Sequence, residues 1–255
     1  TTGNTNSANK IAVLKLNGPI LENPPMFYDF GLLNKVNVIY TSQIKEILGH
    51  LEIEKINGLV VSINSPGGSV SATHTIYNLL KNFSKKNSID IFFHTNELMA
   101  SGAYWVALSG KKIYANYGSL IGSIGVKGPD WIYFDSPISI SSGIIGQGVE
   151  TKNGIKKFTN ISGNSKDLFN SFRSPTNKER IDLQNITKNI YFDFVKDVEK
   201  NRKIEADIII NNIGAMIFDS KTAKENHLID EIITLDEVIK KMAKHLSIKE
   251  YQIIE

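Results

Sequence analysis

Short apolar segments alternate with amphipathic ones along the first half of the chain. The segments Lys10–Ile20, Leu59–Ile63 and Lys112–Ala115 are short and apolar, which is typical of buried strands. Apolar residues with helical spacing follow Thr41, the expected N-cap of a helix, and recur over Val70–Phe83. Strands that alternate with helices at this spacing predict repeated βαβ units, and hence an α/β fold built in layers.

The length of 255 residues permits one large domain or two small ones. Residues 1–9 are polar and small, so we expect a disordered lead-in there and a single catalytic domain over residues 10–255. Long helices expected after Thr176 and from Leu235 would form a helical C-terminal extension. Segments 21–40 and 127–160 have no clear pattern, and their roles stay open.

Charge and composition exclude several classes of protein. The net charge is 29 − 26 = +3 and the basic residues are scattered, so we expect no nucleic-acid surface. The chain has no cysteine, which excludes disulfides, thiolate nucleophiles and cysteine metal sites. No run reaches the roughly 18 apolar residues that a membrane span needs. The chain begins with Thr1 and a polar stretch, so we expect that an anchor or signal peptide has been removed.

A candidate nucleophile lies in the segment Ile91–Ser109. An apolar strand is followed there by the small residues Met99-Ala-Ser-Gly-Ala103 and then by the short apolar helix Tyr104–Leu108. A serine at such a turn, Ser101, would lie beside the free N–H groups of a helix start, where negative charge is stabilised. Nucleophilic serines are presented in this way, although the motif is not G-x-S-x-G. The alternative is that Ser101 only caps a core helix.

A glycine turn follows the earlier strand, in Asn64-Ser-Pro-Gly-Gly68. Pro66 fixes its own φ, and the two glycines permit backbone conformations that other residues avoid. Such a turn can direct a backbone N–H at a bound oxyanion. Strands that end in glycine turns also occur in nucleotide-binding folds, so the turn alone does not define a function.

Taken together, the glycine turn and Ala100-Ser-Gly-Ala-Tyr104 resemble motifs of the clan that contains Clp protease and the signal peptide peptidase A family. The resemblance covers most of the chain, from Lys10 to about Ala243. It implies the layered βαβ fold of Clp protease and crotonase-like proteins. Within this clan, the catalytic base distinguishes the families.

A serine nucleophile needs a base within hydrogen-bond reach. In the Clp protease pattern the base is a histidine about 25 positions after the serine, but Ser123–Gly128 contains no histidine. His74 and His94 could approach the site, yet His74 is expected on a helix and His94 on a buried strand. The other histidines are His50, His227 and His245. A Ser-His-Asp triad is therefore not expected.

The signal peptide peptidase A family uses a Ser-Lys dyad, in which a neutral lysine takes the proton of the serine. Its lysine lies in a Ser-Gly-x-x-Lys-Asp motif, and Ser162-Gly-Asn-Ser-Lys-Asp167 matches it with Lys166 as the lysine. Ser101 and Lys166 are 166 − 101 = 65 residues apart, more than we expect for a single-domain member. An insertion within residues 127–160 would explain this separation.

Further roles follow from the same resemblance. Gly118–Val126 matches a family segment whose second serine hydrogen-bonds the catalytic lysine, and that serine is Ser123. The backbone N–H groups of Gly68 and Gly102 match the oxyanion-hole positions. No metal, nucleotide or other cofactor is implied.

The resemblance implies a serine endopeptidase that cleaves peptides with small or apolar residues, such as remnant signal peptides in or near the membrane. It also implies a membrane-associated protein with an extracytoplasmic catalytic domain. Since each motif occurs once, we expect a head-to-tail ring of about eight subunits that share the dyad between protomers. Two alternatives remain open, namely a crotonase-like acyl-CoA enzyme and a catalytically silent membrane-assembly scaffold.

Overall fold

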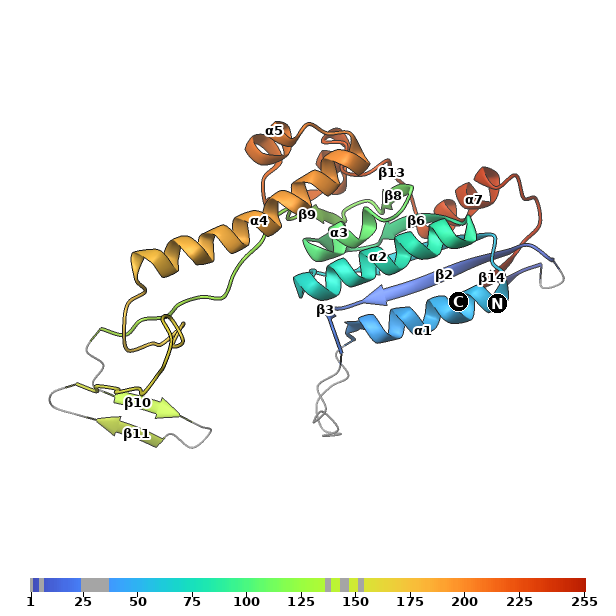
Figure 1. Ribbon diagram of the computed structural model, residues 1–255. Helices are drawn as coiled ribbons and strands as arrows, with labels where there is room; N and C mark the ends of the chain where they lie inside the picture. Colours follow the sequence, from blue (N-terminus) through green and yellow to red (C-terminus); the bar gives the residue numbers. More distant parts are fainter. Residues whose placement is uncertain (1, 5–6, 24–36, 136–138, 143–146, 151–153) are drawn as a thin grey trace. The chain divides into compact units, whose positions relative to one another are not determined.

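The computed structural model describes residues 2–4, 7–23, 37–135, 139–142, 147–150 and 154–255 (Figure 1). The chain divides into two compact units. Unit 1 comprises residues 1–125 and 192–255, and unit 2 comprises residues 126–191. Each unit is described by itself, and the single catalytic domain over residues 10–255 stays a prediction.

Unit 1 is built on a seven-stranded sheet with the order β1-β14-β2-β5-β6-β8-β13. All neighbouring strands are parallel except β1, which is antiparallel to β14. The strands are β1 (Thr2–Gly3), β2 (Lys10–Asn17), β5 (Gly58–Asn64), β6 (Asp90–Thr95), β8 (Lys112–Ala115), β13 (Glu231–Ile232) and β14 (Gln252–Ile254). The predicted α/β fold with layered βαβ units is confirmed.

Helices cover both faces of this sheet. Figure 1 shows α1 (Thr41–Glu54) and α2 (Val70–Asn87) side by side over one face. Helix α7 (Leu235–His245) packs on the other face, where Val238 and Met242 contact sheet residues that include Val13 and Val60. Burying each such side chain stabilises the folded state by roughly 1.5–3 kcal/mol. Because both faces of the sheet are covered, its central strands are nearly continuous apolar runs.

A smaller three-stranded sheet, with the order β12-β9-β7, carries the candidate site. Strand β7 (Leu98–Ala100) is parallel to β9 (Leu120–Gly122), and β12 (Ile217–Asp219) is antiparallel to β9. Helix α3 (Gly102–Ala107) follows β7 and is buried throughout. The remaining elements of unit 1 are β3 (Ile20–Leu21), β4 (Ile39–Tyr40), α5 (Ala206–Ile208), the π-helix η1 (Ile209–Ile213) and α6 (Ser220–Glu225).

The described residues of unit 2 include the antiparallel strands β10 (Ser139–Ser142) and β11 (Gln147–Glu150). Helix α4 (Asn177–Arg202) begins in unit 2 and ends in unit 1. Thr176 and Glu179 form a capping box at its start, since each side chain bonds the other residue's backbone N–H. This explains why the predicted long helix begins after Thr176.

Two details differ from the simplest expectation. Helix α1 begins at Thr41, but Tyr40 takes the N-cap position, because the Thr41 hydroxyl donates its hydrogen bond to the carbonyl of Glu22 instead. At the expected lead-in, Thr2–Gly3 pair with β14, and Asn9 donates to the carbonyl of Glu250. Residues 24–36 of the unpatterned segment 21–40 lie outside the described residues.

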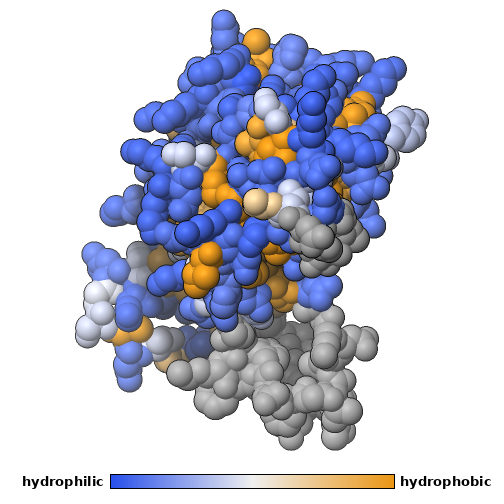
Figure 2. Space-filling view, turned by 90° about the vertical axis from the view of Figure 1, so that its right-hand side faces the viewer, coloured by the Kyte–Doolittle hydropathy of each residue, from blue (hydrophilic) through white to orange (hydrophobic). Residues whose placement is uncertain are grey.

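On the face shown in Figure 2, hydrophilic side chains predominate, and hydrophobic ones form small separate areas between them. None of the helices in the described part of the chain is long and apolar enough to cross a membrane.

Candidate active site

Ser101 lies at the sharp turn between β7 and α3. Its backbone has φ 53° and ψ −123°, a combination that costs a non-glycine residue on the order of 1–3 kcal/mol. The turn is held by a hydrogen bond from the Ser101 N–H to the carbonyl of Gly122 (2.9 Å) and by one from the Trp105 N–H to the Ser101 carbonyl (3.0 Å). The Ser101 hydroxyl does not cap α3, and the residue is partly exposed. The serine is thus presented on a buried scaffold, and its hydroxyl has no hydrogen-bond partner among the residues that the structure describes.

The glycine turn after β5 packs against this serine turn. Gly67 has φ 92°, and a Cβ atom on it would lie 2.6 Å from the Gly102 nitrogen and 3.0 Å from the Ser101 Cβ. Only a residue without a side chain permits this approach. Hydrogen bonds from the Ser65 N–H to the Leu98 carbonyl and from the Ala100 N–H to the Ser65 carbonyl connect the two segments.

The Asn64 side chain fixes the start of the same turn. Its Oδ1 accepts hydrogen bonds from the Thr95 hydroxyl (2.9 Å) and from the backbone N–H groups of Asn96 and Glu97 (both 3.0 Å). Three donors on one amide oxygen tie the end of β5 to the turn between β6 and β7.

The backbone N–H groups of Gly68 and Gly102 are close together. The Gly68 nitrogen lies 3.4 Å from the position that a Cβ atom would take on Gly102. Gly102 is the first residue of α3, so its N–H has no acceptor within the helix. Neither N–H donates a hydrogen bond to any residue that the structure describes. Two free donors beside a serine hydroxyl form an arrangement that can stabilise an oxyanion.

Ser123 follows β9 just as Ser101 follows β7. Ala100 and Gly122 are register partners, so the two serines come directly after paired positions. Ser123 also has positive φ, 54°, and its N–H donates to the Met216 carbonyl at 2.7 Å. Unit 1 therefore brings together four of the five predicted site residues.

Lys166, the fifth, belongs to unit 2. It lies in the turn after Gly163, its N–H bonds the Gly163 carbonyl at 3.4 Å, and its side chain is exposed. The next residue, Asp167, forms an ion pair with Arg173.

The two histidines considered as alternatives have other surroundings. His94 is fully buried on β6, and its Nε2 contacts the Ile233 carbonyl at 3.0 Å. Burial lowers the pKa of His94. His74 is exposed on α2, where its Nδ1 contacts the Asn78 amide at 3.0 Å.

Sequence reasoning missed one residue beside the site. Thr73 on α2 is 1% exposed, and its hydroxyl has no partner within the described residues. That hydroxyl oxygen lies 2.4 Å from where a Cβ atom on Gly102 would be. A threonine within a helix carries no sequence signal of this contact, because the contact depends on how α2 packs against α3.

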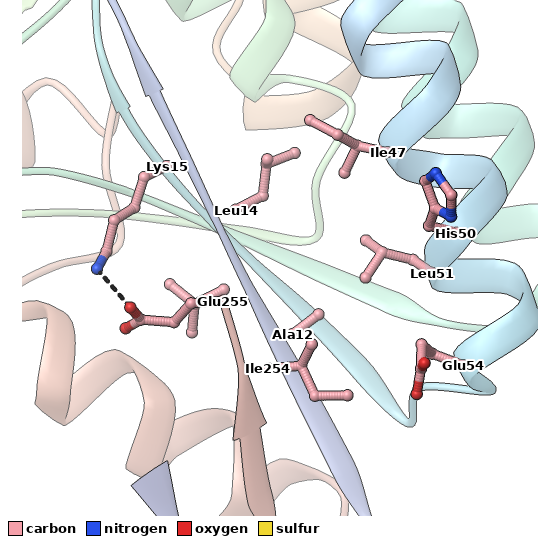
Figure 3. Close-up of a pocket in the computed structure, with 10 residues that line it drawn as sticks. Ala12, Leu14, Lys15, Ile47, His50, Leu51, Glu54, Ile254 and Glu255 are labelled. Carbon is pink, nitrogen blue, oxygen red and sulfur yellow. Dashed lines mark hydrogen bonds and ion pairs between the residues drawn. The ribbon is translucent and has the colours of Figure 1, made fainter. Parts of the chain in front are cut away.

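A cavity of about 410 Å³ lies between α1 and the strands β2 and β14 (Figure 3). Leu14, Leu51 and Ile254 contribute apolar walls, and an ion pair between Lys15 and Glu255 (3.0 Å) lies at its side. None of its lining residues is a predicted site residue. Among the described residues, no cluster of His, Cys, Asp or Glu could hold a metal ion.

Comparison with known protein families shows which family has this arrangement of motifs. The model of peptidase family S49 matches residues 84–249, which include Ser101, Ser123 and Lys166. The chain belongs to peptidase family S49. The model of Clp protease also matches, over residues 30–117. The resemblance inferred from the serine and glycine motifs is therefore confirmed.

Two relatives of this S49 chain are similar over nearly its whole length. A protein of Methanocaldococcus jannaschii assigned as a protease is 27% identical over 237 residues, which cover 90% of this chain and 70% of the relative. A protein of Enterococcus faecium assigned as signal peptide peptidase SppA is 27% identical over 252 residues, 98% of this chain and 67% of the relative.

Solved structures share the S49 chain's fold. A serine-to-alanine variant of the 1510-N membrane-bound stomatin-specific protease aligns with a TM-score of 0.53 and 14% identity, over 92% of this chain and 85% of that one. A variant of ClpP1 from Listeria monocytogenes aligns with a TM-score of 0.53 and 13% identity, over 88% and 92% of the two chains. At these identities the likeness concerns the fold.

Proposed function

We propose that this S49 peptidase is a serine endopeptidase with a Ser-Lys dyad, in which Ser101 is the nucleophile and Lys166 the general base and acid. The observation that carries the proposal is the strained turn at Ser101, which leaves the hydroxyl uncapped beside the free N–H groups of Gly68 and Gly102. Lys166 comes from its motif within the S49 match.

In the proposed mechanism, the Ser101 oxygen attacks the carbonyl carbon of the scissile peptide bond while its proton passes to the neutral Lys166 amine. The carbonyl oxygen becomes an oxyanion that accepts hydrogen bonds from Gly68 and Gly102. When the C–N bond breaks, the Lys166 ammonium returns the proton to the leaving amine. Water then hydrolyses the acyl-enzyme by the same two proton transfers. Ser123 would orient the lysine through a hydrogen bond without adding charge.

We further propose that the substrates are extended peptides with small or apolar side chains, such as remnant signal peptides. The relative assigned as signal peptide peptidase SppA supports this class. The name of the membrane-bound stomatin-specific protease supports a location at a membrane. We propose from the family resemblance alone that the catalytic part lies outside the cytoplasm.

Assembly into a ring is the final part of the proposal. The chain has one copy of each motif, and Ser101 and Lys166 belong to different units. We propose that each site takes its serine from one protomer and its lysine from the neighbour. Such a head-to-tail contact closes into a ring, and the family resemblance favours about eight subunits.

Labelling with a fluorophosphonate tests the serine mechanism directly. We expect the wild-type chain to react at Ser101, and Ser101→Ala to remain unlabelled. Lys166→Ala should lower both the labelling rate and peptide hydrolysis by a factor of about 10³ or more, because no other group takes the proton. Ser123→Ala should cost less, since it removes only an orienting hydrogen bond.

Because Ser101 and Lys166 act as one unit, the double variant should be no worse than either single variant. A folded Lys166→Ala variant with full activity would exclude the dyad. An unreactive Ser101 in the wild-type chain would instead favour the crotonase-like enzyme or the silent scaffold.

A further inference from the structure

The turn that carries Lys166 is held by the neighbouring Asp167. The Asp167 carboxylate accepts two hydrogen bonds from Arg173, from Nε at 2.8 Å and from Nη2 at 2.7 Å. Asn170 closes the same turn, because its N–H bonds the Asp167 carbonyl at 3.1 Å. Paired bonds from a planar guanidinium fix direction as well as distance.

The other side of the same guanidinium binds Glu179. Arg173 donates from Nη1 at 2.9 Å and from Nη2 at 2.8 Å to its two carboxylate oxygens. Glu179 is only 4% exposed and also accepts hydrogen bonds from the N–H and hydroxyl of Thr176. Arg173 therefore joins the lysine turn to the capping box at the start of α4. We call Asp167, Arg173 and Glu179 the arginine bridge.

Trp131 completes the surroundings of this bridge. The Arg173 guanidinium lies 5.1 Å from the centre of the Trp131 ring, which also contacts Phe169 at 5.4 Å. The Trp131 indole N–H donates to the Asn170 carbonyl at 3.1 Å. Trp131 thus contacts both the Arg173 guanidinium and the turn that Arg173 holds in place.

The bridge stays charged over a wide pH range. Hydrogen bonds from Arg173 lower the pKa of Asp167 to about 2, and they lower the pKa of Glu179 as well. The geometry of the lysine turn is therefore insensitive to protonation at any pH at which a neutral lysine could act.

We propose that Arg173 is a positioning residue for the reaction, which acts through Asp167 to hold the proposed base Lys166 in its productive position. This inference rests on the proposed Ser-Lys function. A lysine at position 173 could not replace the arginine, because a single ammonium cannot form two parallel pairs with two carboxylates.

Arg173→Gln and Arg173→Lys test the proposal through steady-state kinetics and thermal unfolding. We expect kcat to fall by about 10- to 100-fold with KM changed less than about threefold, because a misplaced base slows the proton transfer and leaves peptide binding intact. Lys178→Gln is the matched control, since it removes a cation that pairs with Asp182 at the exposed start of α4. Its kcat should remain at the wild-type value.

A second measurement separates positioning from a structural role. In the Lys166→Ala background, Arg173→Gln should not slow fluorophosphonate labelling of Ser101 further, because its effect passes through Lys166. An independent, additive loss in that background would overturn the proposal, as would an unchanged kcat in folded Arg173→Gln. If Arg173→Gln does not fold, Asp167→Asn is measured in the same way, since it leaves Arg173 paired with Glu179.

The two hypotheses fail in different ways. Full activity of Lys166→Ala would contradict the proposed dyad itself. An inactive Lys166→Ala combined with a fully active Arg173→Gln would contradict only the positioning role.

Discussion

At the scale of single residues, the candidate site depends on its glycines as much as on residues with side chains. Gly67 lies against the Ser101 turn, and Gly102 lies against the Thr73 hydroxyl, so that neither position has room for a Cβ atom. These close contacts set the positions of the amide nitrogens of Gly68 and Gly102. Small displacements of these nitrogens should lower the reaction rate, because a donor stabilises an oxyanion only over a narrow range of distances.

We therefore expect Gly102→Ala to lower kcat by about 10²-fold, because the new methyl group would displace the amide beside Thr73. The overpacking should also cost about 1–3 kcal/mol of stability. Thr73→Ala removes the opposing hydroxyl and methyl groups, so the Gly102→Ala/Thr73→Ala double variant should regain part of both losses. Hydrolysis rates and urea unfolding measure the two effects, with Thr73→Ala alone as the control. A double variant no better than Gly102→Ala would show that this contact does not position the amide.

At the scale of secondary-structure elements, the buried β6 strand contains an ionisable group. His94 is fully buried, its Nε2 contacts the Ile233 carbonyl, and its Nδ1 has no partner among the described residues. Burial lowers the pKa of His94 below its ordinary value near 6.5. Below that pH the unfolded chain binds a proton more readily than the folded one, so stability should fall as the pH decreases.

His94→Gln should flatten this pH dependence, since glutamine keeps an N–H donor and does not ionise. We expect the urea midpoint of the wild-type chain to fall between pH 8 and pH 5 by more than that of His94→Gln. His50→Gln is the matched control, because it makes the same substitution at a histidine that lies exposed on α1. Equal slopes for wild type and His94→Gln would mean that other groups cause the acid sensitivity.

The same scale shows what the sequence can predict. The strands β2, β5 and β6 were predicted from apolar runs, whereas Ser101, Ser123, Gly68 and Gly102 were assigned from motifs that resemble those of the family. The pairing of β7 with β9 was not predicted, because three-residue strands have too little pattern. The arginine bridge was also missed. Each member is six residues from the next along the chain, and only the folded turn shows which charges form ion pairs.

At the scale of the whole molecule, the shared dyad predicts complementation between inactive chains. Equal amounts of Ser101→Ala and Lys166→Ala chains, mixed under conditions of subunit exchange, should form some sites with both wild-type residues. Random head-to-tail placement gives about a quarter of the sites this composition, so about a quarter of wild-type activity should return.

The control replaces the Lys166→Ala chain with the Ser101→Ala/Lys166→Ala double variant, which supplies no serine. Light scattering and mass spectrometry of the mixture establish that mixed rings have formed. If mixed rings are present and remain inactive, the dyad lies within one chain.

The place of β14 between β1 and β2 has a consequence for synthesis of the protein in the cell. Gln252 pairs in register with Lys10, 252 − 10 = 242 residues earlier, so this edge of β2 lacks its neighbour until β14 is made. At a synthesis rate of roughly 5–20 residues per second, about 12 to 48 seconds pass on the ribosome before β14 can pair with that edge. An unpaired apolar strand can pair with other nascent chains during that time. Protection of this edge by chaperones during synthesis should therefore raise the yield of soluble protein.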